Sequence, residues 1–471
     1  MAIGVRWPVS PAAWAALSPA AAFGFQWQLG NTVLVGDAPG RVLFWARLPM
    51  LLIALLLGWV LWAWGRRMLG DAAAVGALVL FALDPALIAH GPLVTTDVGC
   101  AAFVTLFVFA LWRYLQRRTP GRLLLGGLAL GAALAAKFSA VFLLPIAALV
   151  LLLGTPLPLG RRLLWTAAAL VAVAAAAVVV VEAAYFFPRD PWLYVRGLRQ
   201  VYTGIDPGYL PYMAGEFRRH FWSYELVAYL LKEPLPSVIL AGVGLWTIAR
   251  PGLTVADRAC LLVPPAVLAA AYAAFAANLG VRYAIPLLPF LHLIGGAGLA
   301  ALLAGGRVRR VCAWLLVAWL ATAAIGVYPD HLSYFNETAC ALSEPRQLGL
   351  DGGSRCGPHW LDDSNVDWGQ GVRQLAAWVQ AHPGPEPLRL AYFGSFPPEA
   401  SGLRYEPLDA RILKDRPPVG RYVLSAHIVA RLRGALRARP EGGWLLGARP
   451  TAIVGHAYYV FDVMGGADMA R

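Results

Sequence analysis

Three ionisable residues stand at the borders of strongly apolar segments, where an uncompensated charge is costly. Asp97 ends the segment HGPLVTTD, Lys137 interrupts LALGAALAAKFSAVFLLP, and Arg282 lies in NLGVRYAIPLLPF. An arginine with a nearby lysine can bind a phosphate or pyrophosphate group, and a carboxylate beside them can take part in chemistry. The ionisable residues at the same predicted face of the membrane are Asp84, His90, Asp97, Lys137, Lys232, Glu233 and Arg282.

Each of the three also has an ordinary structural explanation. Asp97 follows two threonines and fits the N-terminal cap of an apolar span at 98–115. Lys137 could extend its ammonium group to the membrane interface, and Arg282 could anchor to lipid headgroups. Because Lys137 is one of only three lysines among 39 basic residues, its presence in an apolar segment indicates a specific role. The sequence alone leaves both interpretations open.

Long apolar segments must position these residues. Hydrophobic residues make up 59% of the chain and charged residues 14%, and apolar runs of about 18 residues or more are typical of membrane-spanning helices. The sequence therefore predicts a multi-pass α-helical membrane protein with about nine or ten spans. The predicted spans are 43–64, 72–90, 98–115, a short pair at 123–136 and 138–153, 163–186, 235–249, 259–277, 281–303 and 310–328.

The net charge of +13 reflects membrane topology and not nucleic-acid binding. Arginines cluster in alternate loops, around residues 66–67, 117–122, 161–162, 250–258 and 307–310. If these loops are cytoplasmic, residues 187–234 and everything after 328 face outward. The bias toward arginine and alanine indicates a bacterium, so we expect the inner membrane, with the site and the C-terminal region facing the periplasm.

Three regions follow from this pattern. Residues 1–42 form an outward-facing juxtamembrane segment, residues 43–328 a transmembrane bundle with an outer loop at 187–234, and residues 329–471 a small soluble α/β domain. In that domain we expect strands at 388–394, 420–426 and 457–463, and helices at 368–382 and 425–437. The orientation also requires a span before residue 43, so we expect the natural chain to begin earlier and this sequence to be N-terminally shortened.

The five cysteines fit the same topology. Cys100, Cys260 and Cys312 lie in or beside spans, as small apolar residues do. Cys340 and Cys356 lie in the exported region, where a disulfide between them could persist, and two free thiols are the alternative.

The densest polar segment of the C-terminal region is LDDSNVDWGQG, residues 361–371. Its acidic residues do not have the spacing of a calcium loop, so no metal ligands are assigned. Asp363, Asn365, Asp367 and Trp368 could contact a sugar or an acceptor, or could cap the helix that follows. No P-loop, dinucleotide fingerprint, G-x-S-x-G or zinc spacing is present; no cofactor is certain, and a divalent metal stays an open option.

Six motifs in order carry a resemblance to a known family. They are DPALIAHGPLVTTDVG, GGLALGAALAAKFSAVFLLP, LKEPLP, GVRYAIPLLPF, YPDHLSYFNE and LDDSNVDWGQG. Together they resemble the bacterial phospholipid-carrier-dependent glycosyltransferases, which are related to protein O-mannosyltransferases and aminoarabinose transferases and have the GT-C membrane fold. The resemblance implies inverting transfer of a sugar from a polyprenyl-phosphate-linked donor to an acceptor hydroxyl at the outer face of the membrane.

The resemblance also implies roles for individual residues. Asp97 would be catalytic, while Lys137 and Arg282 would bind the donor phosphate as it leaves. Supporting residues would be His90, Thr96, Lys232 and Tyr283. The implied partners are the lipid-linked donor, membrane lipid and a protein, lipid or glycan acceptor, with no nucleic acid.

One departure keeps a second class of function open. The family has its principal catalytic carboxylate in an acidic motif of the first outer loop, whereas this chain has a single acidic residue, Asp37, before Asp71. Asp37 lies too close to the span at 43 to be that residue. A non-catalytic membrane protein that binds or assembles lipid-linked glycans is therefore the alternative to the enzyme. A transporter is disfavoured by the large outer domain and the lack of internal repeats.

Overall fold

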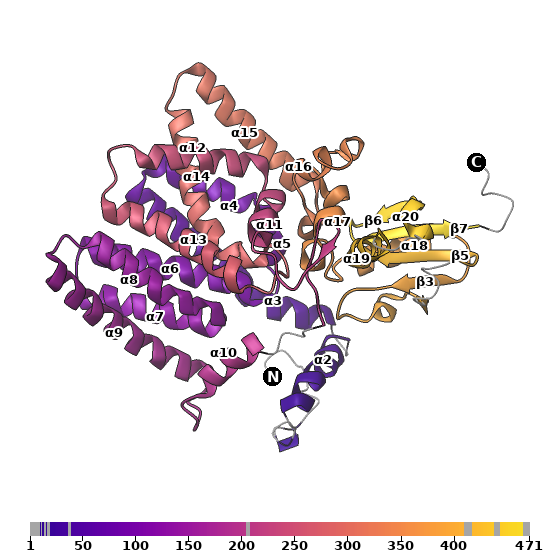
Figure 1. Ribbon diagram of the computed structural model, residues 1–471, viewed down its shortest axis with the longest axis horizontal. Helices are drawn as coiled ribbons and strands as arrows, with labels where there is room; N and C mark the ends of the chain where they lie inside the picture. Colours follow the sequence, from indigo (N-terminus) through magenta and orange to yellow (C-terminus); the bar gives the residue numbers. More distant parts are fainter. Residues whose placement is uncertain are drawn as a thin grey trace.

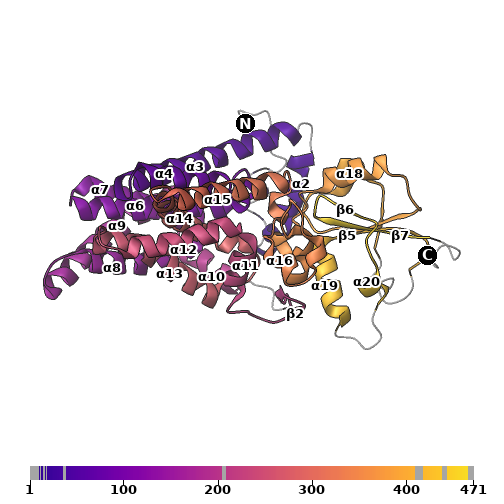
Figure 2. The same ribbon diagram turned by 90° about the horizontal axis from the view of Figure 1, so that it is seen from above.

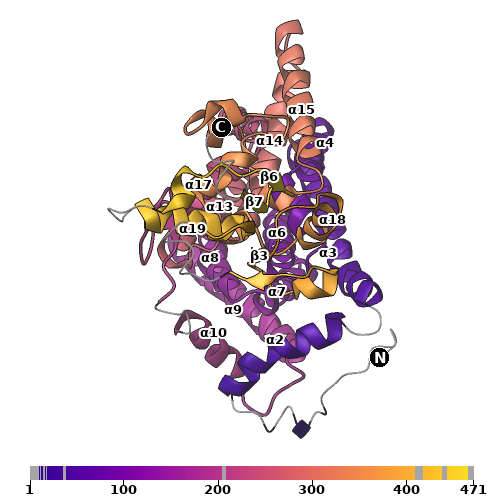
Figure 3. The same ribbon diagram turned by 90° about the vertical axis from the view of Figure 1, so that its right-hand side faces the viewer.

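A computed structural model describes residues 10, 12, 13, 16, 19–35, 39–203, 208–408, 417–437 and 443–464. A bundle of helices forms most of the molecule, and a smaller unit built around a β-sheet lies at one end of it (Figures 1 and 2). Seen from that end, the sheet and its helices lie in front of the bundle (Figure 3). The predicted fold class, a multi-pass helical membrane protein with a C-terminal α/β domain, is confirmed.

In the described part of the chain, six segments are helical, long and apolar enough to cross a membrane. They contain α3 (Pro39–Met68), α6 (Thr96–Gln116), α9 (Leu159–Ala184), α13 (Val255–Phe275), α14 (Leu288–Leu303) and α15 (Arg307–Gly326). A bent pair could make a seventh: α11 (Tyr224–Lys232) and α12 (Leu235–Ala249) meet at 110°. Shorter apolar helices are α4 (Asp71–Ala82), α7 (Pro120–Ala136) and the 3-10 helix η1 (Phe138–Phe142) continued by α8 (Leu143–Gly154).

The number of long spans is smaller than the sequence predicted, because the predicted span 72–90 contains a break and the predicted pair at 123–136 and 138–153 consists of shorter helices. The range 72–90 divides at Asp84, whose carboxylate accepts hydrogen bonds from the backbone N–H groups of Ala86 and Leu87 and so starts a new helix, α5 (Pro85–His90). Lys137 has extended backbone geometry and separates α7 from η1. A hydropathy profile measures the apolar character of a segment, and it does not detect a break in the helix.

Several helices carry arginine at the same end of the bundle. Arg117 follows α6 and Arg122 begins α7, Arg258 lies in the first turn of α13, and Arg307 begins α15. The guanidinium of Arg122 donates to the carbonyl oxygens of Arg113 and Arg117, which joins two of these ends. We call this end the arginine end. The other end of the same helices carries Asp97, Lys137 and Arg282 and adjoins the C-terminal domain.

Residues 19–35 form a helix, α2 (Pro19–Val35), which contacts α3 and otherwise lies apart from the bundle (Figure 1). The sequence predicted an interfacial segment here. Asp37 lies outside the described residues.

The described part of the segment 187–234, predicted as an outer loop, contains two helices and a short pair of strands. Its elements are α10 (Leu193–Thr203), the antiparallel pair β1 (Tyr212–Met213) and β2 (Glu216–Phe217), and then α11. Met213 forms an isolated bridge with Leu361, and Tyr212 donates to the carbonyl oxygen of His359. This loop therefore packs against the C-terminal domain.

The C-terminal domain is built on a five-stranded mixed sheet with the order β4-β3-β5-β7-β6. The three predicted strands correspond to β3, β5 and β7, and the two predicted helices to α18 and α19. The strands are β3 (Leu388–Ala391), β4 (Glu406–Pro407), β5 (Gly420–Ser425), β6 (Ala452–Val454) and β7 (Tyr458–Val463). The helices are α16 (Thr338–Ala341), α17 (Gly357–Trp360), α18 (Val372–Ala381), α19 (Ala426–Arg437) and α20 (Trp444–Gly447).

A buried polar joint centred on Asn365 holds this domain to the bundle. The Asn365 side chain accepts from the backbone N–H of Val281 at 2.9 Å and donates to the hydroxyl of Tyr224 at 3.0 Å. Lys232 donates to the carbonyl oxygens of Asn365 and Leu332, both at 2.6 Å. The joint fixes the start of the α14 segment against the motif LDDSNVDWGQG.

Helix α14 packs tightly on α12 because glycines remove the side chains between them. A Cβ atom at Gly244 would lie 1.8 Å from the carbonyl oxygen of Ile294, and one at Gly298 would lie 2.3 Å from that of Leu240. Two residues from Gly244 on the same helix, Gly242 faces open space.

We expect Gly244→Ala to lower the thermal unfolding temperature of the detergent-solubilised protein, since the new methyl group must force two backbones apart at a cost of about 1–3 kcal/mol. Gly242→Ala is the matched control and should leave stability unchanged or slightly higher, because alanine favours helix more than glycine does. Equal effects of the two variants would contradict the close packing.

Two further features stabilise the C-terminal region. Cys340 and Cys356 form the disulfide that the sequence predicted. His456 lies between two carboxylates, with Nδ1 2.9 Å from Asp330 and Nε2 2.9 Å from Asp351. Burial lowers the pKa of His456, but the hydrogen bonds to both carboxylates outweigh it and raise the pKa to about 9.

This shift predicts a pH-dependent contribution to stability. Because the folded-state pKa is raised above the unfolded value of about 6.5, the stabilisation is complete below that value and is lost as the pH rises through about 9. His456→Gln should therefore lower the unfolding temperature clearly at pH 6 and much less at pH 10. A destabilisation of the same size at both pH values would show that His456 does not act as a cation.

Candidate active site

Asp97 and Lys137, 40 residues apart, form an ion pair at the domain-facing end of the bundle. The Lys137 ammonium group donates to Oδ1 of Asp97 at 2.7 Å, with 3% of the Asp97 side chain and 15% of the Lys137 side chain exposed. Thr95 is the N-cap residue of α6 and makes no side-chain cap. The structure therefore shows Asp97 as the partner of Lys137, which the capping interpretation of the local sequence did not foresee.

Lys137 reaches Asp97 because α7 ends beside it. Lys137 lies at the break between α7 and η1, and its side chain contacts Asp97 with only 15% of it exposed. The ammonium group lies 4.6 Å from the ring centroid of Tyr283, so a tyrosine face covers one side of the cation. These contacts do not support the interpretation of Lys137 as a residue that extends to the interface.

Arg282 lies in the 3-10 helix η2 (Val281–Tyr283), directly after the joint with Asn365. Its guanidinium carbon is 5.0 Å from the ring centroid of Trp368 and 5.7 Å from that of Tyr283. No carboxylate of the described residues forms an ion pair with Arg282, and its Nε atom is buried without a hydrogen-bond partner. A guanidinium held between aromatic rings with donors unused is ready to bind an anion.

His90 completes this side of the site. It ends α5, is buried, and its Nδ1 atom has no hydrogen-bond partner among the described residues. Its ring centroid lies 6.3 Å from that of Trp368. The predicted residues His90, Arg282, Tyr283 and Trp368 thus meet at the boundary between the bundle and the C-terminal domain.

A cavity of about 470 Å³ opens beside the ion pair. Its polar lining includes Thr96, Lys137, Tyr202 and Tyr283, and the remainder of the lining is largely apolar. A cation at one end of a mostly apolar cavity is suited to an amphiphile with an anionic head and a hydrocarbon chain.

A second cavity, of about 520 Å³, shares part of its wall with the first. The end of α13 and the following segment, residues 275–277 and 279, line both. The second cavity is also lined by Tyr209, Arg219, His220 and Asp363. Two adjoining cavities could hold two different ligands.

The predicted residues of LDDSNVDWGQG divide between the cavities and the framework. Asp363 accepts from the hydroxyl of Tyr209 at 2.9 Å and lines the second cavity. Asn365 belongs to the joint, and Asp367 accepts from Gly369 N–H at 2.8 Å and from the hydroxyl of Ser425. Burial raises the pKa of Asp367 to about 7.

The predicted residue Lys232 also belongs to the framework. Both of its hydrogen bonds go to backbone carbonyl oxygens, and the side chain is buried with the ammonium group 4.5 Å from the ring centroid of Phe335. Lys232 therefore holds the domain in place and does not face the cavity that Lys137 lines.

Sequence reasoning missed several residues of the two cavities. Ser139 and Tyr272 approach each other within 3.3 Å in the first cavity, and Tyr209 and His220 line the second. Glu225, buried in α11, lies 3.5 Å from the amide of Asn278. A buried glutamate in the apolar segment YELVAYLL is the one signal in the sequence that could have drawn attention to this region.

The fold and the site together define a multi-pass membrane protein with a cationic, aromatic-lined site where its bundle meets an α/β domain. Residues 23–182, about a third of the chain, match the family model of the dolichyl-phosphate-mannose-protein mannosyltransferases. This match includes both Asp97 and Lys137 and confirms the resemblance to that group of glycosyltransferases. A search of the curated proteins finds no match.

Solved structures similar to this chain include those of ArnT and of an archaeal oligosaccharyltransferase. The crystal structure of ArnT from Cupriavidus metallidurans bound to undecaprenyl phosphate is 16% identical, with 92% of this chain and 86% of that chain covered and a TM-score of 0.42. The crystal structure of the Archaeoglobus fulgidus oligosaccharyltransferase tethered with an acceptor peptide is 12% identical, with 77% and 48% covered and a TM-score of 0.39.

The unpaired guanidinium leads to a binding prediction. Arg282→Ala should weaken binding of a long-chain alkyl phosphate to the detergent-solubilised protein by about 10- to 100-fold, as expected for hydrogen bonds to a charged group. Arg346→Ala, at an exposed arginine of the C-terminal region, should leave the affinity unchanged. Equal affinities of wild type and Arg282→Ala in a binding titration would exclude Arg282 from phosphate recognition.

Proposed function

We propose that this protein transfers a sugar from a polyprenyl-phosphate-linked donor to an acceptor hydroxyl, with inversion at the anomeric carbon. The observation that carries the proposal is the Asp97–Lys137 ion pair beside a mostly apolar cavity, with Lys137 and Arg282 both close to the ring of Tyr283 in the cavity lining. The family match over residues 23–182 supports a glycosyltransferase reaction, and mannose is the sugar named by that family.

The donor would lie in the first cavity. Its isoprenoid chain would contact the apolar lining, and its phosphate would lie between Arg282 and Lys137. As the bond between the anomeric carbon and the phosphate oxygen breaks, negative charge grows on the phosphate. The two cations stabilise that charge in surroundings from which water is largely excluded.

Asp97 would act as the general base. In the structure its carboxylate is neutralised by Lys137 at 2.7 Å, which makes it a weak base. A donor phosphate competes for the Lys137 ammonium group, so donor binding would free Asp97 to accept the proton of the acceptor hydroxyl. The acceptor oxygen then bonds to the anomeric carbon, and polyprenyl phosphate leaves with the electron pair of the broken bond.

The acceptor would enter through the second cavity. Tyr209, His220 and Asp363 there offer hydrogen-bonding groups suited to a hydroxylated ligand. Because this cavity shares a wall with the first, a small displacement of that wall would bring acceptor and donor together.

The proposal includes an orientation in a bacterial inner membrane. Arginine-rich segments are retained in the cytoplasm, and they lie at the opposite end of the bundle from Asp97 and the C-terminal domain. The site and the domain would thus face the periplasm, where the Cys340–Cys356 disulfide is compatible with an oxidising compartment.

Asp97→Asn should abolish or reduce sugar transfer by about 100-fold or more, since the amide keeps the size of the side chain but cannot accept the proton. The assay follows release of polyprenyl phosphate from polyprenyl-phosphate-mannose in membranes that contain the protein. Asp71→Asn, at an exposed carboxylate of the arginine end, should keep full activity. Near-normal turnover of Asp97→Asn would refute the role of Asp97.

The same assay separates the enzyme from the non-catalytic alternative. A wild-type protein that binds polyprenyl phosphate but releases none from the mannose-linked donor, in membranes that supply lipid, glycan and protein acceptors, would support a lipid-linked-glycan-binding protein. Turnover above the background of membranes without the protein excludes that alternative.

A further inference from the structure

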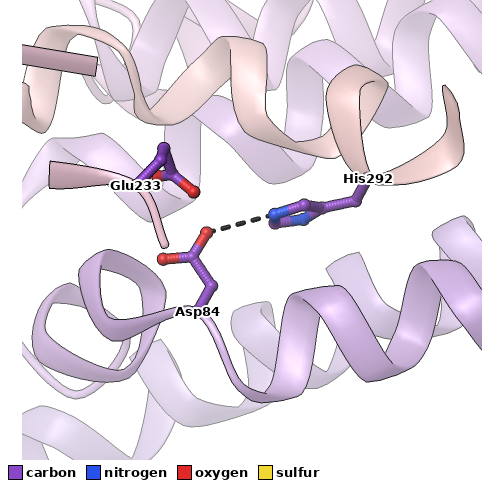
Figure 4. Close-up of side chains that lie close together, drawn as sticks. All are labelled: Asp84, Glu233 and His292. Atoms are coloured by element: carbon purple, nitrogen blue, oxygen red, sulfur yellow. Dashed lines mark ion pairs between the residues drawn. The ribbon is translucent and has the colours of Figure 1, made fainter. Parts of the chain in front are cut away.

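Asp84, Glu233 and His292 meet in the interior of the bundle, away from both cavities (Figure 4). They come from three separate elements: Asp84 joins α4 to α5, Glu233 lies at the bend between α11 and α12, and His292 lies in α14. The carboxylates of Asp84 and Glu233 and the imidazole of His292 point toward one another (Figure 4). One potential ligand atom from each lies within 4.8 Å of the other two.

The three side chains are buried, and each has at least one polar atom without a hydrogen bond among the described residues. Asp84, Glu233 and His292 are 0%, 1% and 2% exposed. Asp84 uses Oδ1 to cap α5, while its Oδ2 atom has no hydrogen-bond partner among the described residues. The same is true of Oε1 of Glu233 and of both ring nitrogens of His292. His292 Nε2 approaches Asp84 Oδ2 to 3.1 Å, without the geometry of a hydrogen bond.

Lys232, the nearest lysine along the chain, makes no hydrogen bond to the side chains of Glu233, Asp84 or His292. Lys232, adjacent to Glu233, donates to the carbonyl oxygens of Leu332 and Asn365. Leaving Oδ2 of Asp84, Oε1 of Glu233 and both ring nitrogens of His292 buried without hydrogen bonds would be costly. A cation among them would supply the missing interactions.

Another cluster of the same residue types shows what a self-sufficient arrangement looks like. His456 also lies between two carboxylates, but both of its ring nitrogens make 2.9 Å hydrogen bonds to Asp330 and Asp351. Gln374 donates to Asp330, and Arg355 to Asp351. That cluster has its own protons and cations, whereas the Asp84 cluster has unused lone pairs directed at a common point.

We propose that Asp84, Glu233 and His292 bind one divalent transition-metal cation, of which zinc, manganese(II) and iron(II) suit two carboxylates with one imidazole. Ligand atoms bonded to one ion at about 2.1 Å lie roughly 3.0–3.5 Å apart in octahedral or tetrahedral geometry. The 3.1 Å separation of His292 Nε2 and Asp84 Oδ2 already meets this condition. Ordinary side-chain rotation of Glu233 brings in the third ligand.

The bound ion has a positioning role. Asp84 begins the helix that ends at His90, Glu233 follows the joint residue Lys232, and His292 lies on the segment that begins with Arg282. One ion thus ties together the elements that carry His90, Lys232 and Arg282. It has no contact with the cavity that Lys137 lines, so it acts by stabilising structure and not on the reacting atoms.

The test measures metal content in the full chain, purified in detergent through a tag without histidines. After a brief wash with a chelator to remove loosely held ions, elemental analysis should give about one zinc, manganese or iron per wild-type chain. Glu233→Gln and His292→Ala should each lower this content at least tenfold. His456→Gln, in the self-sufficient cluster, is the matched control and should keep the metal.

Three results would overturn the proposal. The first is a wild-type protein that neither contains metal nor binds added zinc, manganese(II) or iron(II). The second is equal metal content in wild type and both variants, and the third is equal loss in the His456→Gln control. If the variants fail to fold, X-ray absorption at the metal edge of wild type replaces them: oxygen ligands with a single imidazole support the site, and sulfur or several imidazoles refute it.

Discussion

The architecture depends on one buried polar joint between the bundle and the C-terminal domain. The Asn365 side chain accepts a hydrogen bond from the backbone N–H of Val281 and donates one to the hydroxyl of Tyr224. Lys232 donates hydrogen bonds to two backbone carbonyl oxygens of the domain. Breaking any of these bonds would leave a buried polar group without a partner, which is costly in a dry environment. The joint therefore has a narrow range of geometries, and it places Arg282 and Trp368 in contact.

The working residues occupy breaks in the helices. Lys137 lies where α7 gives way to η1, Arg282 lies in η2, and Glu233 lies at the 110° bend between α11 and α12. At membrane depth, irregular backbone is tolerated only where protein or a cavity satisfies its polar groups. Lys137 thereby reaches Asp97, and Arg282 reaches Trp368 of the domain. Glu233 instead faces Asp84 and His292 in the interior of the bundle.

The buried carboxylate of Asp97 and the buried carboxylates of Asp84 and Glu233 differ in how their charge is balanced. Asp97 has a cation at 2.7 Å, and its charge is balanced before any ligand arrives. Asp84 and Glu233 have no such hydrogen-bonded cation, and His292 adds a third polar group that is not satisfied by the protein. Under the proposed mechanism, the first arrangement would exchange its partner for a ligand. The second would be balanced by the cation proposed to bind there.

The sequence by itself determined what depends on composition and local order. Apolar runs defined the helical bundle, alternate arginine clusters gave its two ends, and β-branched runs located β3, β5 and β7. It also identified Asp97, Lys137 and Arg282, because charges beside apolar segments are conspicuous. Only the tertiary structure decided that Asp97 pairs with Lys137, that Asn365 and Lys232 are framework, and that His292 faces Asp84. Those contacts join residues far apart in the chain, and their partners depend on helix breaks and packing that hydropathy does not encode.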